Sequence, residues 1–398
     1  MMKFSKRIEA VKTSLTLEIT ALANELKAKG EDVIGFGAGE PDFNTPDNVK
    51  EAAIRAIQEN KTRYTPVGGT NELKDAIIHK FNQDNNLDYQ RNQIVVSCGA
   101  KHSFYNLAQV LWDKGDEVLV PGPYWLSYPE MILLAGGQAV LIPTSEKTGF
   151  KVTPSQIDAA VTGQTKAIVI NSPSNPTGSA YSKQELEAIA QCALKHNLLI
   201  ISDEIYEKIV FDGFEQISIA SLGKEVQENC VIINGMSKCY AMTGWRIGYL
   251  AAPPEIAQQV TKLQCQSTSN PTSISQAASV EALTGPQDYV TQMVNEFTKR
   301  RNVLMELLSE IDGVSCHRPT GSFYTFPDFS AYYGKKYQGE TITGSVDFAR
   351  FLLKEAQVAL VPGVAFGADN NVRLSFATSQ EIIKKGMGRI AVAVAKLR

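Results

Sequence analysis

The sequence predicts an α/β fold in which a mainly parallel sheet is covered by helices, joined to a smaller α+β domain. Two observations support this prediction. Between residues 94 and 251, short apolar runs alternate with helical stretches, as in parallel strands joined by helical crossovers. After residue 313, strand patterns mix with two helical patterns, as in an α+β domain. A chain of 398 residues is long enough for two or three domains, each with its own core.

The expected elements follow one another along the chain. Apolar residues at helical spacing predict a helix over residues 16–30 that ends at Gly30. The same spacing predicts helices over residues 47–59, 71–82, 255–284, 287–311, 345–357 and 379–397. Strands are expected in seven apolar runs, at residues 94–98, 117–120, 139–142, 167–170, 198–202, 230–233 and 247–251. We expect residues 48–285 to form the large domain, and residues 1–47 together with 286–398 to form the small one.

Composition and charge exclude several classes of protein. With 43% hydrophobic and 20% charged residues, the composition is that of an ordinary soluble protein. The net charge is −3 and the chain has no basic tail, so neither nucleic acid nor a membrane is an expected partner. The six cysteines form no C-x-x-C pair, and the four histidines lack metal-ligand spacing, so we expect no metal and no disulfide framework. Scattered cysteines and the lack of a secretory signal favour a reducing, cytoplasmic location.

One lysine has neighbours that indicate its chemistry. Lys238 follows Ser237 on a loop just beyond the expected strand 230–233, and Arg246 lies eight residues later. Loops at the carboxyl ends of parallel strands often carry catalytic groups. A hydroxyl and a guanidinium suit a phosphate, and a lysine beside a phosphate site suits pyridoxal phosphate (PLP), which needs an amine and an anion anchor. The alternative is a surface lysine in a glycine-containing loop.

Two more segments could contact such a cofactor. Gly99 and Ala100 begin a helical pattern directly after the expected strand 94–98, and small residues there allow backbone N–H groups to approach a phosphate. An ordinary turn explains the same residues equally well. Trp125 follows the strand 117–120 and could stack on a planar ring, although packing in the core would also explain it.

Polar residues follow the next two strands. Asn175 lies in a turn of two prolines and a glycine that could aim it back at the sheet edge. Asp203 ends the strand 198–202, where a carboxylate can keep a pyridine nitrogen protonated, and Tyr206 could bond a ring oxygen. Asp203 could equally be the N-cap of a following helix.

An arginine within an alternating strand points to an anion site. Arg373 lies in the segment Asn371–Phe376, and an inward arginine is costly unless it meets an anion. Its forked guanidinium fits a substrate α-carboxylate. An exposed arginine on an edge strand is the alternative.

Together and in this order, these motifs resemble the fold-type I PLP-dependent aminotransferases, and within them the class I-beta aspartate aminotransferase subgroup, which includes aspartate/prephenate aminotransferases. The resemblance extends from residue 5 to residue 395. It implies the PLP-dependent transferase fold type I. It also implies reversible ping-pong transfer of an amino group between aspartate or glutamate and oxaloacetate or 2-oxoglutarate, with conversion of prephenate to arogenate as a second activity.

The resemblance also implies roles for individual residues. Lys238 would bind PLP covalently and later move a proton. The other implied cofactor contacts are Gly99, Ala100, Lys101, Trp125, Asn175, Asp203, Tyr206, Ser237 and Arg246. Tyr64 resembles a tyrosine that reaches the phosphate of the neighbouring subunit, which implies a homodimer with shared active sites. The implied substrate contacts are Gly39, Trp125, Asn175 and Arg373, with Lys101, Ser14 and Thr16 at the distal carboxylate and Lys12 for prephenate. Lys12 could equally be a solvated charge at a helix start.

Other functions remain open at this stage. Alanine, aromatic and kynurenine aminotransferases and PLP-dependent β-lyases use the same fold. A PLP-binding transcription regulator would carry an additional N-terminal DNA-binding module, whereas the enzyme-like pattern here begins almost at Met1. A purely structural α/β protein would not need the combined phosphate, ring and carboxylate groups.

Overall fold

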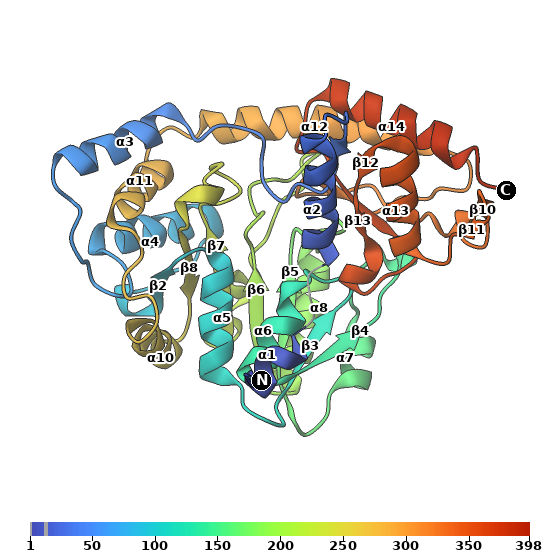
Figure 1. The fold of residues 1–398 in the computed structure, drawn as a ribbon. Helices are drawn as coiled ribbons and strands as arrows, with labels where there is room; N and C mark the ends of the chain where they lie inside the picture. Colours follow the sequence, from blue (N-terminus) through green and yellow to red (C-terminus); the bar gives the residue numbers. More distant parts are fainter. Residues whose placement is uncertain (1, 12–14) are drawn as a thin grey trace.

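A seven-stranded sheet forms the centre of the molecule (Figure 1). The computed structural model describes residues 2–11 and 15–398, with side chains from residue 21 onward in the second range. The strand order is β2-β8-β7-β6-β5-β3-β4. The strands are β2 (Ile94–Ser97), β3 (Glu117–Pro121), β4 (Gln138–Ile142), β5 (Thr165–Asn171), β6 (Leu199–Asp203), β7 (Cys230–Gly235) and β8 (Gly248–Ala251). Only β8 is antiparallel to its neighbours, so the expected mainly parallel sheet is confirmed.

Helices cover both faces of this sheet, which explains why its strands are continuous apolar runs. Successive residues of a strand point to opposite faces. In β3, Val118 and Val120 join a core cluster with α5 (Ala100–Leu111), α6 (Ser127–Ala135) and α10 (Pro254–Cys265). Leu119, between them, belongs to the other cluster, which includes residues of α4 (Asn71–Asn85) and α8 (Lys183–Lys195). The strands are thus fixed from both sides, and their polar residues gather at the ends.

The remaining helices are α1 (Lys6–Ala10), α2 (Leu15–Ala28), α3 (Asp47–Gln58), α7 (Pro154–Ala160), α9 (Lys224–Glu228), α11 (Ser273–Thr284), α12 (Asp288–Ser309), α13 (Ser345–Ala356) and α14 (Gln380–Val394). Of these, α2, α3, α12, α13 and α14 lie close to predicted helical ranges, whereas α1, α7 and α9 fall outside them. The expected helical stretch 255–284 consists of two helices, α10 and α11. Pro271 lies between them, where it cannot donate a helical hydrogen bond and disfavours a helical residue before it.

The last third of the chain forms smaller sheets. β14 (Val372–Ser375) is the middle strand of three, between β13 (Val361–Pro362) and β9 (Tyr324–Thr325), and both pairings are antiparallel. β1 (Ile34–Gly35) pairs in parallel with β12 (Val358–Ala359), which brings an N-terminal segment beside this part of the chain (Figure 1). The remaining hairpin is β10 (Lys336–Tyr337) with β11 (Glu340–Thr341).

The cysteines and the helices bear on the expected absence of a disulfide framework and of a membrane span. All six cysteines are free thiols. Across the described residues, every helix is too short or too polar to cross a lipid bilayer.

Candidate active site

A cavity of about 970 Å³ lies at the carboxyl ends of the central parallel strands, where ligands bind in open α/β sheets. Its walls come from several distant segments, including the loop before α3 and the strand β14. Eleven of the residues expected from the sequence line this cavity. They are Gly39, Ala100, Lys101, Trp125, Asn175, Asp203, Tyr206, Ser237, Lys238, Arg246 and Arg373.

Lys238 places its amine inside this cavity. The residue follows β7, whose six residues are all buried, so the start of the loop is fixed by the core. Its Nζ donates a hydrogen bond to the carbonyl oxygen of Gly39. Burial, and then the nearby guanidinium of Arg373, lower the pKa of Lys238 to about 8. An appreciable fraction of the amine is therefore uncharged near neutral pH, as a nucleophile or general base requires.

Asp203 is a buried carboxylate at the end of β6, with an exposed fraction of 5%. Tyr128 donates its hydroxyl to Oδ2 at 2.5 Å, and the backbone N–H of Ile205 donates to Oδ1 at 3.2 Å. Burial raises the pKa of Asp203, while these two hydrogen bonds act in the opposite direction. A turn rather than a helix follows β6, so the interpretation of Asp203 as a helix N-cap is wrong.

Arg373 is a buried cation held by neutral partners. Its Nη1 donates to Oδ1 of Asn175 at 2.9 Å and its Nη2 to the carbonyl oxygen of Gly37 at 3.0 Å. Its Nε has no hydrogen-bond partner in the described part of the chain. All four residues of β14, the central strand of its sheet, are buried, so the alternative of an exposed edge-strand arginine is wrong. A buried guanidinium with an unused donor is suited to an incoming carboxylate.

A second anion-binding region surrounds the start of α5. Gly99 has a φ of 95°, and a Cβ built there would lie 2.4 Å from Nη2 of Arg246. Arg246 is fixed by hydrogen bonds from Nη1 to the Thr243 carbonyl at 2.7 Å and from Nη2 to the Cys98 carbonyl at 3.3 Å. The free N–H groups of the first helical turn, the guanidinium and the Ser237 hydroxyl face the same cavity, an arrangement suited to a phosphate.

Trp125 and Lys101 form another part of the cavity wall. Trp125 is half-buried, and its ring meets that of Tyr128 edge to face, with centroids 5.2 Å apart. The Lys101 Nζ lies 4.8 Å from the Trp125 ring centroid. Burial, and then the charge of Arg246, lower the pKa of Lys101. The tryptophan thus presents part of its surface to the cavity and is not simply core.

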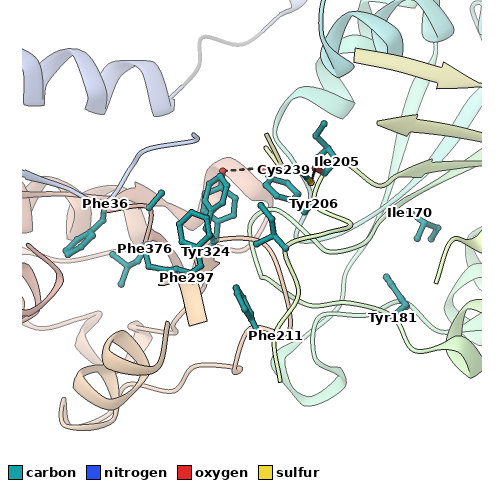
Figure 2. Close-up of a cluster of buried hydrophobic side chains, with 14 of the residues drawn as sticks. Phe36, Ile170, Tyr181, Ile205, Tyr206, Phe211, Cys239, Phe297, Tyr324 and Phe376 are labelled. Atoms are coloured by element: carbon teal, nitrogen blue, oxygen red, sulfur yellow. Dashed lines mark hydrogen bonds between the residues drawn. The ribbon is translucent and has the colours of Figure 1, made fainter. Parts of the chain in front are cut away.

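Three residues of the site were not identified from the sequence. Tyr128 bonds Asp203, and Asn171 bonds both the Asp203 carbonyl, at 3.0 Å, and the Asn175 N–H, at 2.9 Å. Tyr324 lies beside Tyr206 (Figure 2), and the two hydroxyl oxygens are 3.2 Å apart. The position of Tyr128, three residues after Trp125, was a usable signal. The place of Tyr324 depends on strand pairing between distant segments, which the sequence does not display.

Five expected residues are not among those that line the cavity in the described part of the chain. Gly99 directly precedes the lining residue Ala100. Tyr64 is 92% exposed and lies outside the described lining. Lys12 and Ser14 are outside the described residues, and Thr16 belongs to α2 but its side chain is not described.

One group of possible metal ligands, Asp158, Cys192 and His196, occurs among the described residues, away from this cavity. There a single Asp158 oxygen already contacts Lys195 at 2.8 Å and His196 at 2.6 Å, so the group is an ion-pair cluster and we assign no metal to it.

The fold and the cavity together define an α/β enzyme whose cavity is lined by a lysine, a buried carboxylate and a buried arginine. Residues 31–390 match the family model for aminotransferase class I and II. The chain is 50% identical to an aspartate aminotransferase of Geobacillus stearothermophilus, with 98% of each chain covered. It is 46% identical to an aspartate/prephenate aminotransferase of Cereibacter sphaeroides, with 99% of each covered. The crystal structure of an aspartate aminotransferase from Rhizobium meliloti covers 100% of both chains with a TM-score of 0.97 and 42% identity. The chain belongs to the class I and II aminotransferases, which confirms the resemblance and the predicted enzyme class.

Proposed function

We propose that this aminotransferase uses PLP to transfer amino groups between aspartate or glutamate and 2-oxoglutarate or oxaloacetate. The observation that carries the proposal is the position of the Lys238 amine, in one cavity with the buried carboxylate of Asp203 and the unfilled guanidinium of Arg373. The names of its relatives, aspartate aminotransferase and aspartate/prephenate aminotransferase, support the substrate class.

The residues present fit PLP. The close approach of Gly99 to Arg246 leaves no room for a side chain and forms a cradle suited to a phosphate. Asp203 would pair with the pyridine nitrogen, Asn175 and Tyr206 would bond the ring oxygen, and Trp125 would stack on the ring. Ala100, Lys101, Ser237 and Arg246 would surround the phosphate. When bound, the cofactor supplies an electron sink for the substrate carbon.

The chain's own residues would then bind the substrate and move its proton. Lys238 would first hold the cofactor covalently. Its amine, once free, would accept the substrate's α-proton and return it to a carbon of the cofactor, and the lowered pKa that Lys238 has in the cofactor-free chain supports this role. Arg373 and the backbone of Gly39 would grip the α-carboxylate. Asp203 would keep its negative charge next to a protonated ring, assisted by the Tyr128 hydroxyl.

Lys101 would bind the distal carboxylate of a dicarboxylic substrate, with Ser14 and Thr16 nearby and Lys12 serving prephenate. Its amine lies at the cavity wall, over the Trp125 ring. Conversion of prephenate to arogenate is the proposed second activity. Alanine, aromatic or kynurenine transamination and β-elimination are the alternatives on the same scaffold.

We further propose a cytoplasmic homodimer with shared active sites. Tyr64 is almost fully exposed in its own chain, as expected for a side chain that reaches the phosphate of a neighbouring subunit. Residues 48–285 would form the large domain, and residues 1–47 with 286–398 the small domain. β1 supports this division, because it pairs with β12 in the C-terminal third.

Specificity constants for aspartate, glutamate and prephenate, measured with wild-type and Lys101→Ala protein, test the proposal. Removal of the Lys101 charge should lower kcat/KM for dicarboxylates by roughly 10-fold to 100-fold, the range expected for a charged hydrogen bond. Alanine and aromatic amino acids should be affected much less. Equal losses for all substrates would contradict the role of Lys101, and turnover of cystathionine to pyruvate and ammonia in place of transamination would favour a β-lyase.

A further inference from the structure

Tyr324 lies where three parts of the site meet. It belongs to β9, is 1% exposed and forms part of the cavity wall. Because β9 pairs antiparallel with β14, Tyr324 lies opposite Ser375 and is a diagonal neighbour of Arg373 on the same face. The Arg373 guanidinium carbon is 4.4 Å from the centroid of the Tyr324 ring, closer than to Phe366 at 5.1 Å. The tyrosine ring therefore supports one face of the guanidinium by a cation–π contact.

The hydroxyl of Tyr324 reaches the opposite wall of the site. Its oxygen is 3.2 Å from the Tyr206 hydroxyl, and the two rings meet edge to face at 82° (Figure 2). A Cβ built on Gly39 would lie 3.8 Å from the same hydroxyl, so this oxygen lies near the Gly39 segment. One side chain thus joins the arginine proposed for the α-carboxylate to the phenol proposed for the cofactor oxygen, and it does so close to Gly39.

The protons of the two phenols determine the direction of their hydrogen bond. Burial raises the pKa of both Tyr206 and Tyr324, so both keep their protons at neutral pH. Two phenols carry two O–H protons, and their mutual bond uses one of them. When Tyr206 donates its proton to a cofactor oxygen, only the proton of Tyr324 is left for the bond between the tyrosines. A donor that itself accepts a hydrogen bond is polarised and donates more strongly.

We propose that Tyr324 is a positioning residue that links the substrate-carboxylate site to the cofactor site. Its ring holds the Arg373 guanidinium, and its hydroxyl donates to Tyr206, which in turn donates to the oxygen of the cofactor ring. This inference rests on the proposed function, since both of its ends serve PLP chemistry. It assigns separate tasks to the ring and to the hydroxyl, and two substitutions can separate them.

Tyr324→Phe and Tyr324→Leu, each loaded with PLP, test the two tasks through two readouts. One is the pH midpoint of the absorbance change of the bound cofactor, and the other is the Kd of maleate, an unreactive dicarboxylate. Tyr324→Phe should move the midpoint to higher pH. Weaker donation from Tyr206 leaves more negative charge on the oxygen of the cofactor ring, and this charge raises the pKa of the nitrogen that would join Lys238 to the cofactor. Its maleate affinity should stay within about 3-fold of wild type, whereas Tyr324→Leu should weaken maleate binding by about 10-fold through loss of the cation–π contact.

A matched control is Tyr332→Phe. Tyr332 is also a buried tyrosine of the C-terminal third, but it donates to the Asp312 carbonyl at 2.7 Å, away from the cavity. Its removal should change neither readout. An unchanged pH midpoint in Tyr324→Phe would overturn the hydroxyl's role, and equal maleate affinities in the two Tyr324 variants would overturn the ring's role. Wild-type protein that never develops PLP absorbance would instead refute the proposed function itself.

Discussion

Removal of the Tyr128 hydroxyl should destabilise the cofactor-free protein in a way that depends on pH. Tyr128→Phe leaves the ring in the core but takes away the 2.5 Å hydrogen bond to Oδ2 of Asp203. A hydrogen bond to a charged group contributes about 1.5–3 kcal/mol, compared with about 0.5–1.5 kcal/mol for one between neutral groups. The loss should therefore be larger when Asp203 is ionised.

The direction with pH follows from the pKa of Asp203. Burial raises this pKa in the folded protein, so the folded state binds more protons than the unfolded state between the unfolded and folded pKa values. Stability therefore falls as pH rises through that interval. Because the Tyr128 hydrogen bond lowers this pKa, Tyr128→Phe should raise it further and extend the fall to higher pH. The difference from wild type should be small at acidic pH and reach about 1.5–3 kcal/mol above the folded pKa.

Urea unfolding of the cofactor-free proteins, at one protein concentration and at about pH 4, near the pKa of an ordinary aspartate, and about pH 8, measures this difference. Tyr332→Phe is the control, since its partner is a backbone carbonyl that does not titrate. The free energy of unfolding that Tyr332→Phe loses should be the same at both pH values. If Tyr128→Phe also lost equal stability at both, Tyr128 would not be acting on the charged form of Asp203, and the argument would fail.

Two further predictions concern the reactive amine and the phosphate cradle. The rate of PLP incorporation into cofactor-free protein, followed by stopped-flow absorbance, should increase as pH rises through about 8, the pKa of Lys238. Arg373→Gln should move the midpoint of this increase to higher pH, because the charge of Arg373 lowers the pKa of Lys238. An unmoved midpoint would contradict this. Gly99→Ala should raise the Kd for PLP by at least about 10-fold, since its methyl group would displace Arg246 from a charge-assisted phosphate contact. Gly115→Ala, at a φ of 101° with nothing within 4 Å, carries similar backbone strain and should keep wild-type PLP affinity; a similar loss in both would attribute the effect to strain alone.

The central sheet was predictable because it depends on local signals. β5, β6 and β7 are apolar runs that end in a polar residue or a glycine, and parallel strands bring those ends to one edge. The cavity residues Asn175, Asp203 and Lys238 follow directly from that rule. The split between α10 and α11 was also marked, by Pro271, although the periodicity alone continued through it.

The parts that escaped prediction depend on contacts between distant segments. Tyr324 meets Arg373 only because β9 pairs with β14, a pairing of two-residue and four-residue strands with little sequence signature. Tyr128 meets Asp203 only when the start of α6 is brought to the end of β6. Side chains that orient catalytic groups are therefore harder to find from sequence than the catalytic groups themselves.

The proposed chemistry requires Lys238 to be the amine that holds PLP. Wild-type and Lys238→Ala proteins should be incubated with PLP, reduced with borohydride, digested and examined by mass spectrometry. We predict that the phosphopyridoxyl group is found on Lys238 of the wild type, and that Lys238→Ala carries no stable label and shows no transamination. A label on a different lysine of the wild type, or normal turnover by Lys238→Ala, would contradict the account.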